Sequence, residues 1–568
     1  MNNRHFILII IMTAVSLLLG FFIGKYYRGK GPQTKMLRIG QNKINEALDV
    51  INNNYVDTVD MSHLTESAVL KIISELDPHS SYIPASDVDA ANEDLESSFS
   101  GIGIQFNMST DTIVVISIIS GGPAEKAGLL PFDRIISVDD SIVAGKNLGN
   151  TKTMKMLRGP KDTKVVLGIQ RGNSEELTKF ELTRGDIPNY SVDVSYKISD
   201  NIGYIKISKF ARSTYSEFLT AIAKLKKEGV NGFIIDLRDN PGGYLESATY
   251  MINEFLSKGQ MIVYTQGRTY RRTNTHSNGK GSCQEAPLVV LINELSGSAS
   301  EIFSGAIQDN DRGMIIGRRS YGKGLVQTKL DLSDRSELLL TIARYYTPSG
   351  RCIQKDYELG KSEKYSMDIF NRFEHGEFFY ADSIKMNDSL EYKTLNGRSV
   401  YGGGGIMPDI FIPTDTSGIT SYFSSLINTG ALYMFALDYS EKNHGKLDKF
   451  NDYKELHEYL KQQPLIDELA DFAATKGVKK RPTLMNISKN IIETQLYAYI
   501  IRNFFDNEGF YPIFYRDDAT LNKAVEVIKK DIWKPEIYEQ YILNTKDEPL
   551  SSIHIPIRNA SKPFYARA

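Results

Sequence analysis

Between about Ile187 and Thr414, short apolar runs alternate with segments of helical periodicity, and this alternation constrains the fold more than any other feature of the sequence. The runs GYIKIS, GFIIDLR, PLVVLIN and MIIGRRS have the length and composition of strands. The segments YSEFLTAIAKLKKEG and SASEIFSGAIQD instead carry apolar residues at helical spacing. Strands that alternate with helices typically form an α/β sheet, so residues 187–415 are predicted to form an α/β core.

The remaining sequence predicts several further domains, because 568 residues are too many for a single hydrophobic core. GIGIQF, TIVVISII and DRIISVDD indicate a small β-rich domain, whereas the apolar spacing before it and after the core indicates helices. Residues 357–400 are polar and weakly periodic, so we interpret them as an insertion in the core and assign them no chemistry. We therefore expect a multidomain α/β (α+β) protein with an anchor and linker (1–35), a helical region (36–97), a β-rich domain (98–186), the core (187–415) and a helical C-terminal domain (416–568).

An uncharged apolar run of 18 residues, Phe6–Ile23, lies near the N-terminus. As a helix it would be about 27 Å long, which is just enough to span the apolar part of a bilayer. A cleavable signal peptide is the alternative, but no A-x-A-like site follows the run, so an uncleaved signal anchor is preferred. The flanking charges do not decide the topology, because one arginine precedes the run and five basic residues follow it: Arg4, then Lys25, Arg28, Lys30, Lys35 and Arg38.

Charge and cysteine content exclude some classes of function. The 67 basic and 69 acidic residues give a formal charge of -2, and no basic stripe stands out, so nucleic acid is not an expected partner. Cys283 and Cys352 fit neither the paired spacing of a zinc site nor a disulfide-rich scaffold. A single bridge between them stays open.

Ser298 stands where an apolar strand ends in small residues and a helix begins, in the segment INELSGSASE. The N-terminus of that helix offers unpaired N–H groups and a partial positive charge, which would stabilise the oxyanion of an acyl transfer. Ser298 is therefore a candidate nucleophile. The alternative is structural, because Ser298 and Glu301 also fit a capping box in which the serine only accepts the N3 amide.

Lys323 is the candidate base for that serine, because His276 and His375 lie in polar stretches that suit a catalytic histidine poorly. A buried lysine can act as a base when desolvation lowers its pKa. Lys323 lies between two glycines and between two strand-like runs; its alternative is an ordinary exposed loop lysine. The segment from Gly317 also matches the start of a phosphate-binding loop, but Gly324 replaces the required Ser or Thr and a strand-like run follows, which disfavours nucleotide hydrolysis.

A third segment, DLRDNPGG, ends a strand in a turn that can direct backbone amides at a substrate carbonyl, although such a turn is often only a tight connection. Together these segments resemble the carboxyl-terminal processing, or tail-specific, serine proteases of peptidase family S41, which carry a PDZ domain. The resemblance covers about Leu76 to Pro413. Its ordered pieces are LDPHSSY, GIGIQF, PAEKAGL, DRIISVDD, MLRGP, DLRDNPGG, GSASEIFSGAIQD, GRRSYGKGLVQ, YYTPSGR and GGGGIMPDI.

The resemblance implies roles for individual residues. Ser298 would be the nucleophile, Lys323 the general base and Gln327 the residue that orients the lysine, while Ser300 would be a decoy. The oxyanion hole would consist of the backbone amides of Gly243 and Ala299. In the PDZ-like domain, the carboxylate-binding loop and strand that receive a substrate tail would be formed by Gly101, Ile102, Gly103 and Ile104. No metal or other cofactor is implied.

The resemblance thus predicts a serine endopeptidase that recognises the C-terminal tails of protein substrates through its PDZ domain. It also implies an inner-membrane anchor and a catalytic domain in the periplasm or an equivalent extracytoplasmic compartment. One departure is Phe132, where the family usually has glycine, and we expect it to alter a turn more than the binding groove. The alternative function is a non-catalytic PDZ scaffold that binds C-termini. Whether the C-terminal helices bind partners, gate the site or form a homo-oligomer stays open.

Overall fold

The structure is a computed structural model that describes residues 34–108, 111–172, 174 and 176–545. The chain divides into two compact units, Met1–Leu76 and Asp77–Ala568. The described part of the first unit consists of two helices, α2 (Thr34–Asn54) and α3 (Met61–Ser74). Within the described ranges, no helix is long and apolar enough to cross a membrane. The predicted anchor, Phe6–Ile23, lies outside those ranges.

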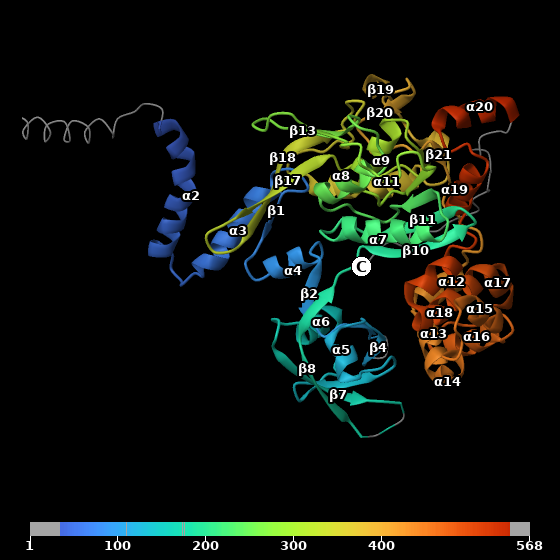
Figure 1. Cartoon of the computed structure of the whole chain (residues 1–568). Coiled ribbons are helices and arrows are strands. Elements are labelled where there is room, and N and C mark those ends of the chain that lie inside the picture. The colour runs from blue at the N-terminus through green and yellow to red at the C-terminus, as the bar shows by residue number, and fades with distance from the viewer. Residues whose placement is uncertain (1–33, 109–110, 173, 175, 546–568) are drawn as a thin grey trace, which may run out of the picture. The chain divides into compact units, whose positions relative to one another are not determined.

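The central sheet of the second unit has six strands in the order β10-β11-β12-β15-β16-β21. Figure 1 labels β10, β11 and β21 of this sheet. From β11 to β21 neighbouring strands are parallel, and β10 pairs antiparallel with β11. Helices α7, α8 and α9 pack on one face, and α19 packs on the other. This three-layer arrangement explains why β12 and β15 are buried along their whole length. The bounds are β10 (Val192–Ser199), β11 (Ile202–Ile207), β12 (Gly232–Asp236), β15 (Leu288–Ile292), β16 (Met314–Gly317), β21 (Ile410–Phe411), α7 (Thr214–Lys227), α8 (Leu245–Asn253), α9 (Ala299–Asp309) and α19 (Ala519–Lys529).

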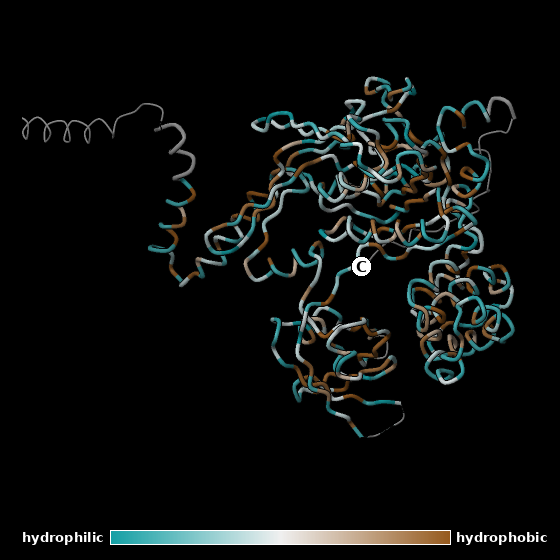
Figure 2. Tube along the Cα trace, in the orientation of Figure 1, coloured by the Kyte–Doolittle hydropathy of each residue, from teal (hydrophilic) through white to brown (hydrophobic). Residues whose placement is uncertain are grey.

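A second, antiparallel sheet has the order β1-β18-β13-β14, and β17 also pairs with β18. The sequence predicted only a break at LDPHSSY, but the last two residues of this segment and Ile83 form β1 against β18. Asp77 stabilises this segment by accepting hydrogen bonds from the Ser80 hydroxyl at 2.6 Å and the Thr341 hydroxyl at 2.9 Å. The bounds are β1 (Ser81–Ile83), β13 (Met261–Gln266), β14 (Thr273–His276), β17 (Leu325–Asp331) and β18 (Glu337–Tyr346). In Figure 2, hydrophilic residues follow the outer loops, including the β13–β14 hairpin.

The predicted β-rich domain is a sheet in the order β3-β4-β5-β7-β8, with β6 paired to β5. Its own hydrophobic core includes Val115, Ile135 and Leu167. Strand β3 is at an edge of this sheet. Strand β2, which comes before the domain in the chain, pairs with β9, which comes after it. The bounds are α4 (Val88–Glu93), β2 (Ser98–Gly101), β3 (Ile104–Asn107), β4 (Ile113–Ile118), α5 (Pro123–Ala127), β5 (Arg134–Val138), β6 (Ser141–Ile142), α6 (Asn150–Leu157), β7 (Lys164–Gln170), β8 (Thr178–Thr183) and β9 (Gly185–Pro188).

The predicted insertion, residues 357–400, contains short elements rather than a long loop. Its helices and strands are only three to seven residues long, which explains why the sequence shows little periodicity there. The bounds are α10 (Ser362–Ser366), α11 (Asp368–Glu374), η1 (Ala381–Ser383), η2 (Asp388–Leu390), β19 (Glu391–Lys393) and β20 (Ser399–Tyr401).

The C-terminal region is helical, as predicted, but its helices belong to more than one core. Helices α12, α13, α15, α16 and α18 share a core that includes Leu426, Phe435 and Leu496. Helix α19 instead completes the central sheet, where Leu521 and Val527 pack near Ile234 and Val289. The bounds are α12 (Ser421–Asn428), α13 (Ala431–Lys442), α14 (His444–Leu447), α15 (Tyr453–Leu460), α16 (Leu465–Thr475), α17 (Pro482–Ile487), α18 (Lys489–Phe514, broken at Phe505 and Asp506) and α20 (Pro535–Thr545).

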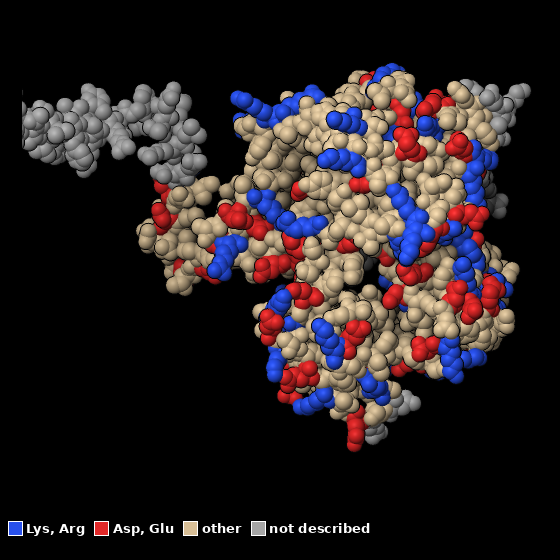
Figure 3. Space-filling model, in the orientation of Figure 1, with Lys and Arg blue, Asp and Glu red and all other residues tan. Residues whose placement is uncertain are grey.

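Charged side chains of both signs are interspersed on the face of the molecule in Figure 3. On the β-rich domain, for example, Lys161 pairs with Asp186 at 2.5 Å and Lys179 with Asp140 at 2.9 Å. Solvent and salt screen such exposed pairs, so the buried cores account for most of the stability.

Phe132 adopts a left-handed backbone with φ of 69°, a conformation that glycine adopts freely and that a residue with a side chain disfavours. Its side chain also makes contacts outside the turn. Its ring is 8% exposed and lies 5.4 Å from the His444 ring and 6.4 Å from the Phe504 ring. The β-rich domain thus contacts the C-terminal helices through a side chain whose backbone conformation is unfavourable.

Replacing Phe132 should separate the cost of its left-handed backbone from the stability that its ring packing contributes. We expect Phe132→Ala to lower the free energy of unfolding by about 3 kcal/mol, because it removes the aromatic packing and keeps the unfavourable φ. Phe132→Gly should lower it by roughly 1 kcal/mol less, because glycine adopts a left-handed conformation freely. Urea unfolding followed by circular dichroism measures both variants. A glycine variant less stable than the alanine variant would contradict this account.

Candidate active site

Ser298 is the last residue of the connection between strand β15 and helix α9 and directly precedes the helix, as the sequence predicted. Its φ of 54° and ψ of -112° lie outside the regions that residues with a side chain favour, and such strain often occurs at functional sites. Asn240 stabilises the turn, because its carbonyl oxygen accepts bonds from the Gly297 amide at 3.0 Å and from the Ser300 hydroxyl at 2.9 Å. The structure therefore gives Ser300 a buried structural partner and leaves Ser298 half-buried.

Glu301, in the first turn of α9, connects the turn at Ser298 to the loop at Lys323. One carboxylate oxygen accepts the backbone amides of Ser298 and Lys323, both at 2.8 Å. The other accepts the Gly322 amide at 2.7 Å and the Ser320 hydroxyl at 2.5 Å. Burial raises the pKa of Glu301, while these four hydrogen bonds oppose the increase. The sequence identified Glu301 only as part of a capping box; the structure shows that it also holds the lysine loop.

Lys323 is half-buried, and its ammonium nitrogen donates to the Gln327 Oε1 atom at 3.1 Å. Burial lowers the pKa of Lys323 below its usual 10.5, although the negative charges of Glu301 and Asp77 oppose this. The residues after Lys323 enter strand β17. The phosphate-loop interpretation requires a helix at that position, so it is wrong.

Gln327 lies on β17, four residues after the lysine, and its Nε2 atom donates to the carbonyl oxygen of His79. The sequence analysis gave His79 no role, although it belongs to the LDPHSSY segment that contributes to the family resemblance. Burial and the positive charge of Lys323 lower the pKa of His79 to about 4, so its imidazole is neutral near pH 7.

The turn after strand β12 lies directly against Ser298. A Cβ atom on Gly242 would be only 2.7 Å from the Ser298 Cβ and 2.9 Å from the Ala299 amide nitrogen. Among the described residues, the Gly243 and Ala299 amides have no protein hydrogen-bond partner. These are the two amides that the family resemblance implies for an oxyanion hole, and only glycine fits at position 242.

Tyr345 on β18 is a further contact that the sequence did not reveal. Its hydroxyl lies within hydrogen-bonding distance of the carbonyl oxygens of Ser298, at 3.0 Å, and Lys323. The two candidate catalytic residues therefore share Tyr345 as well as Glu301 as a partner. A buried tyrosine on a strand looks like any core residue in the sequence, so no local signal distinguishes it.

The PDZ-like segment Gly101–Ile104 comprises the end of β2, a two-residue connection and the start of β3. Gly103 has φ of 79°, and its carbonyl oxygen accepts the Ile119 amide at 3.0 Å. Helix α6 lies beside the far end of β3, since the Thr153 hydroxyl donates to the Met108 sulfur at 3.0 Å. The loop, an edge strand and a nearby helix are thus on one side of this domain.

Cys283 and Cys352 are both free thiols, so the bridge that the sequence left open is not formed. Within the residues that the structure describes, no group of three or more His, Cys, Asp or Glu side chains is arranged to hold a metal ion.

Comparisons with known families match most of the chain. Residues 201–360 match peptidase family S41, residues 100–182 match the PDZ domain, and residues 27–86 match the N-terminal domain of the activating protease CtpB. Residues 422–506, in the helical C-terminal region, match a family of unknown function.

Individual relatives are similar over a large part of their length. A probable CtpA-like serine protease of Staphylococcus haemolyticus is 34% identical over 63% of this chain and 74% of the relative. The carboxy-terminal processing protease CtpB of Bacillus subtilis is 36% identical over 55% of this chain and 65% of its own. A solved photosystem II D1 C-terminal processing protease is 29% identical, with a TM-score of 0.32 over 54% of this chain and 89% of its own.

Proposed function

Because this chain belongs to peptidase family S41, the carboxy-terminal processing serine proteases with a PDZ domain, we propose that it cleaves proteins with a Ser298–Lys323 dyad supported by Gln327. The observation that carries this proposal is the shared carboxylate oxygen of Glu301, which accepts the backbone amides of both Ser298 and Lys323. It brings the strained serine and the lysine of lowered pKa into one site.

The chemistry follows from these positions. Neutral Lys323 accepts the proton of the Ser298 hydroxyl, and the alkoxide attacks a peptide carbonyl carbon. The amides of Gly243 and Ala299 donate to the resulting oxyanion. The lysine ammonium then protonates the departing amine, which leaves an acyl ester on Ser298. Water that the same lysine deprotonates attacks this ester, releases the new C-terminus and restores the serine.

Gln327 limits where the lysine amine can lie. A lysine side chain has four rotatable bonds, so an amine without a partner would sample many positions. The 3.1 Å hydrogen bond to Gln327 Oε1 restricts it, and the glutamine is itself held through its bond to the His79 carbonyl oxygen. We infer that Gln327 orients Lys323 and takes no proton itself.

The PDZ-like domain would bind the C-terminal tail of a substrate. Strand β3 is at the edge of its sheet, and an extended peptide can add to such an edge while its carboxylate meets the amides of the Gly101–Ile104 loop. A bound tail raises the local concentration of the remaining substrate chain near Ser298. Cleavage would therefore favour loosely folded proteins whose tails are accessible.

Alanine variants should identify the nucleophile. We expect Ser298→Ala and Lys323→Ala to lose cleavage of an unfolded protein with an apolar C-terminal tail, by a factor of about 1,000 or more. Ser300→Ala should keep it, because Ser300 donates to the Asn240 carbonyl oxygen instead, and Lys329→Ala on the same strand is a matched control. Mass spectrometry of the fragments measures each variant. An uncut substrate whose tail still binds the parent protein would instead favour a non-catalytic PDZ scaffold.

The lysine base also predicts the direction of the pH dependence. Only the neutral amine accepts a proton, so kcat should fall about tenfold per pH unit on the acid side of the Lys323 pKa. Burial lowers that pKa, so the midpoint should be below 10.5. A profile of log kcat against pH measures it. A rate that increased as the pH fell toward 5 would contradict a lysine base.

We also propose that the apolar run Phe6–Ile23 anchors the protein in the inner membrane with its catalytic part in the periplasm or an equivalent compartment. The support is the length of the run and the usual site of action of such proteases. An alkaline phosphatase fusion after Asp186 should be active, because that enzyme requires an oxidising compartment. A fusion that remained cytoplasmic would refute this location.

A further inference from the structure

Tyr365, on helix α10 of the insertion, is connected to the catalytic lysine through a chain of hydrogen bonds. Lys323 Nζ donates to Gln327 Oε1 at 3.1 Å, and Gln327 Nε2 donates to the carbonyl oxygen of His79. The Nε2 atom of the same histidine lies 2.9 Å from the Tyr365 hydroxyl. The carbonyl oxygen of His79 is thus bonded to Gln327, the partner of Lys323, and its ring is bonded to Tyr365.

A second path joins Tyr365 to the lysine loop. The Gly324 amide donates to Gln354 Oε1 at 2.8 Å, and Gln354 Nε2 donates to the Tyr365 hydroxyl at 3.2 Å. The Tyr365 hydroxyl accepts a hydrogen bond from Gln354, so it can donate a hydrogen bond to His79 Nε2. The low pKa of His79 leaves that nitrogen able to accept it, so donors and acceptors match along both paths.

The insertion also holds the backbone before Lys323. Arg372 on α11 is 4% exposed, and it donates to the carbonyl oxygens of Ser320 at 2.9 Å and Arg319 at 2.7 Å. The Lys355 amide donates to the Gly322 carbonyl oxygen at 3.0 Å. The loop that carries the lysine is therefore bonded to Arg372 inside the insertion and, on both sides of Lys323, to Gln354 and Lys355, which come just before the insertion.

Aromatic and charged groups close the space between the insertion and this loop. The Lys355 ammonium nitrogen lies 4.1 Å from the Tyr321 ring centre and 4.2 Å from that of Tyr365, and it pairs with Asp368 at 2.9 Å. The edge of the Tyr365 ring meets the His79 ring, with 5.1 Å between their centres. These contacts pack the side chains of the insertion against the loop that carries Lys323.

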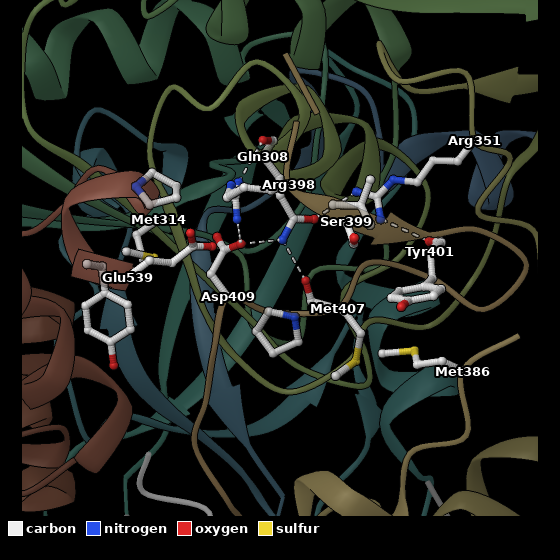
Figure 4. Close-up of a pocket in the computed structure, with 14 residues that line it drawn as sticks. Gln308, Met314, Arg351, Met386, Arg398, Ser399, Tyr401, Met407, Asp409 and Glu539 are labelled. Carbon is white, nitrogen blue, oxygen red and sulfur yellow. Dashed lines mark hydrogen bonds and ion pairs between the residues drawn. The ribbon is translucent and has the colours of Figure 1, made fainter. Parts of the chain in front are cut away.

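The far end of the insertion is anchored to the protease core, so its position is not that of a free loop. Figure 4 shows Arg398 beside Asp409 and Gln308, and the Arg398 guanidinium pairs with Asp409 and Asp311 at 2.7 Å each. Gln308 and Asp311 lie at the C-terminal end of α9, the helix that begins directly after Ser298.

We propose that Tyr365 is a positioning residue for Lys323 and that the insertion completes the active site. Its hydroxyl holds the His79 ring, and thereby the carbonyl oxygen that holds Gln327 and the lysine amine. This inference rests on the proposed Ser298–Lys323 mechanism. Tyr365 touches neither the substrate nor the reacting atoms, so its effect is on the geometry and hydration of the base.

Tyr365→Phe tests the proposal, since it keeps the ring and removes only the hydroxyl. We expect kcat for the unfolded tailed substrate to fall about 3- to 10-fold, with KM changed less than 2-fold. Water that enters to satisfy His79 and Gln354 should weaken the desolvation of Lys323, so the acid limb of the pH profile should move to higher pH. Tyr392→Phe, on the β19–β20 hairpin of the same insertion, is the matched control and should change neither quantity.

A double-mutant cycle separates positioning from a general loss of stability. In a Gln327→Ala background, Tyr365→Phe should lower kcat less than 2-fold, because the path to the lysine amine through Gln327 is already broken and only the path to the Gly324 backbone remains. The role of Tyr365 would be overturned if Tyr365→Phe lowered kcat equally in both backgrounds. It would also be overturned if the variant lowered the unfolding midpoint but left the acid limb of the pH profile unchanged. If Lys323→Ala instead cleaves as well as the parent, the dyad itself is wrong and this inference fails with it.

Discussion

The buried carboxylate of Glu301 is the interaction on which the site depends. It is fully buried and accepts four hydrogen bonds from the serine turn and the lysine loop. A carboxylate without such partners would be strongly destabilised by the loss of water, whereas one with four donors is stable and rigid. Any movement of the lysine loop relative to helix α9 would break some of these bonds. The distance between the two candidate catalytic residues is therefore set by a side chain that does no chemistry.

The parallel sheet makes this arrangement possible. Strands β12, β15 and β16 are neighbours and run in one direction, so the turns that follow them meet at the same edge of the sheet. The first of these turns carries the glycines, the second carries Ser298 and the third leads to Lys323. Successive segments about 25 to 55 residues apart in the chain thus become adjacent without any long loop crossing the site.

The sequence predicted those strands and turns because each has a local signal. A buried strand is a short apolar run, a tight turn contains glycine and proline, and a helix start has small polar residues. The contacts of Tyr345, His79 and Tyr365 had no such signal, because each depends on a segment that is remote in the sequence. The insertion illustrates the limit well. Its elements are too short to show periodicity, and its role follows only from the carbonyl oxygens and side chains that it reaches.

In the proposed mechanism, the protonation state of Lys323 explains why segments remote in the sequence affect catalysis. Lysine is an effective base only when burial disfavours its charge, whereas the nearby carboxylates of Glu301 and Asp77 favour that charge. The balance depends on how completely the surrounding side chains exclude water. Strand β17, the LDPHSSY segment and the insertion each contribute one side of that enclosure. A change in any of them can alter the pKa of the base without touching it.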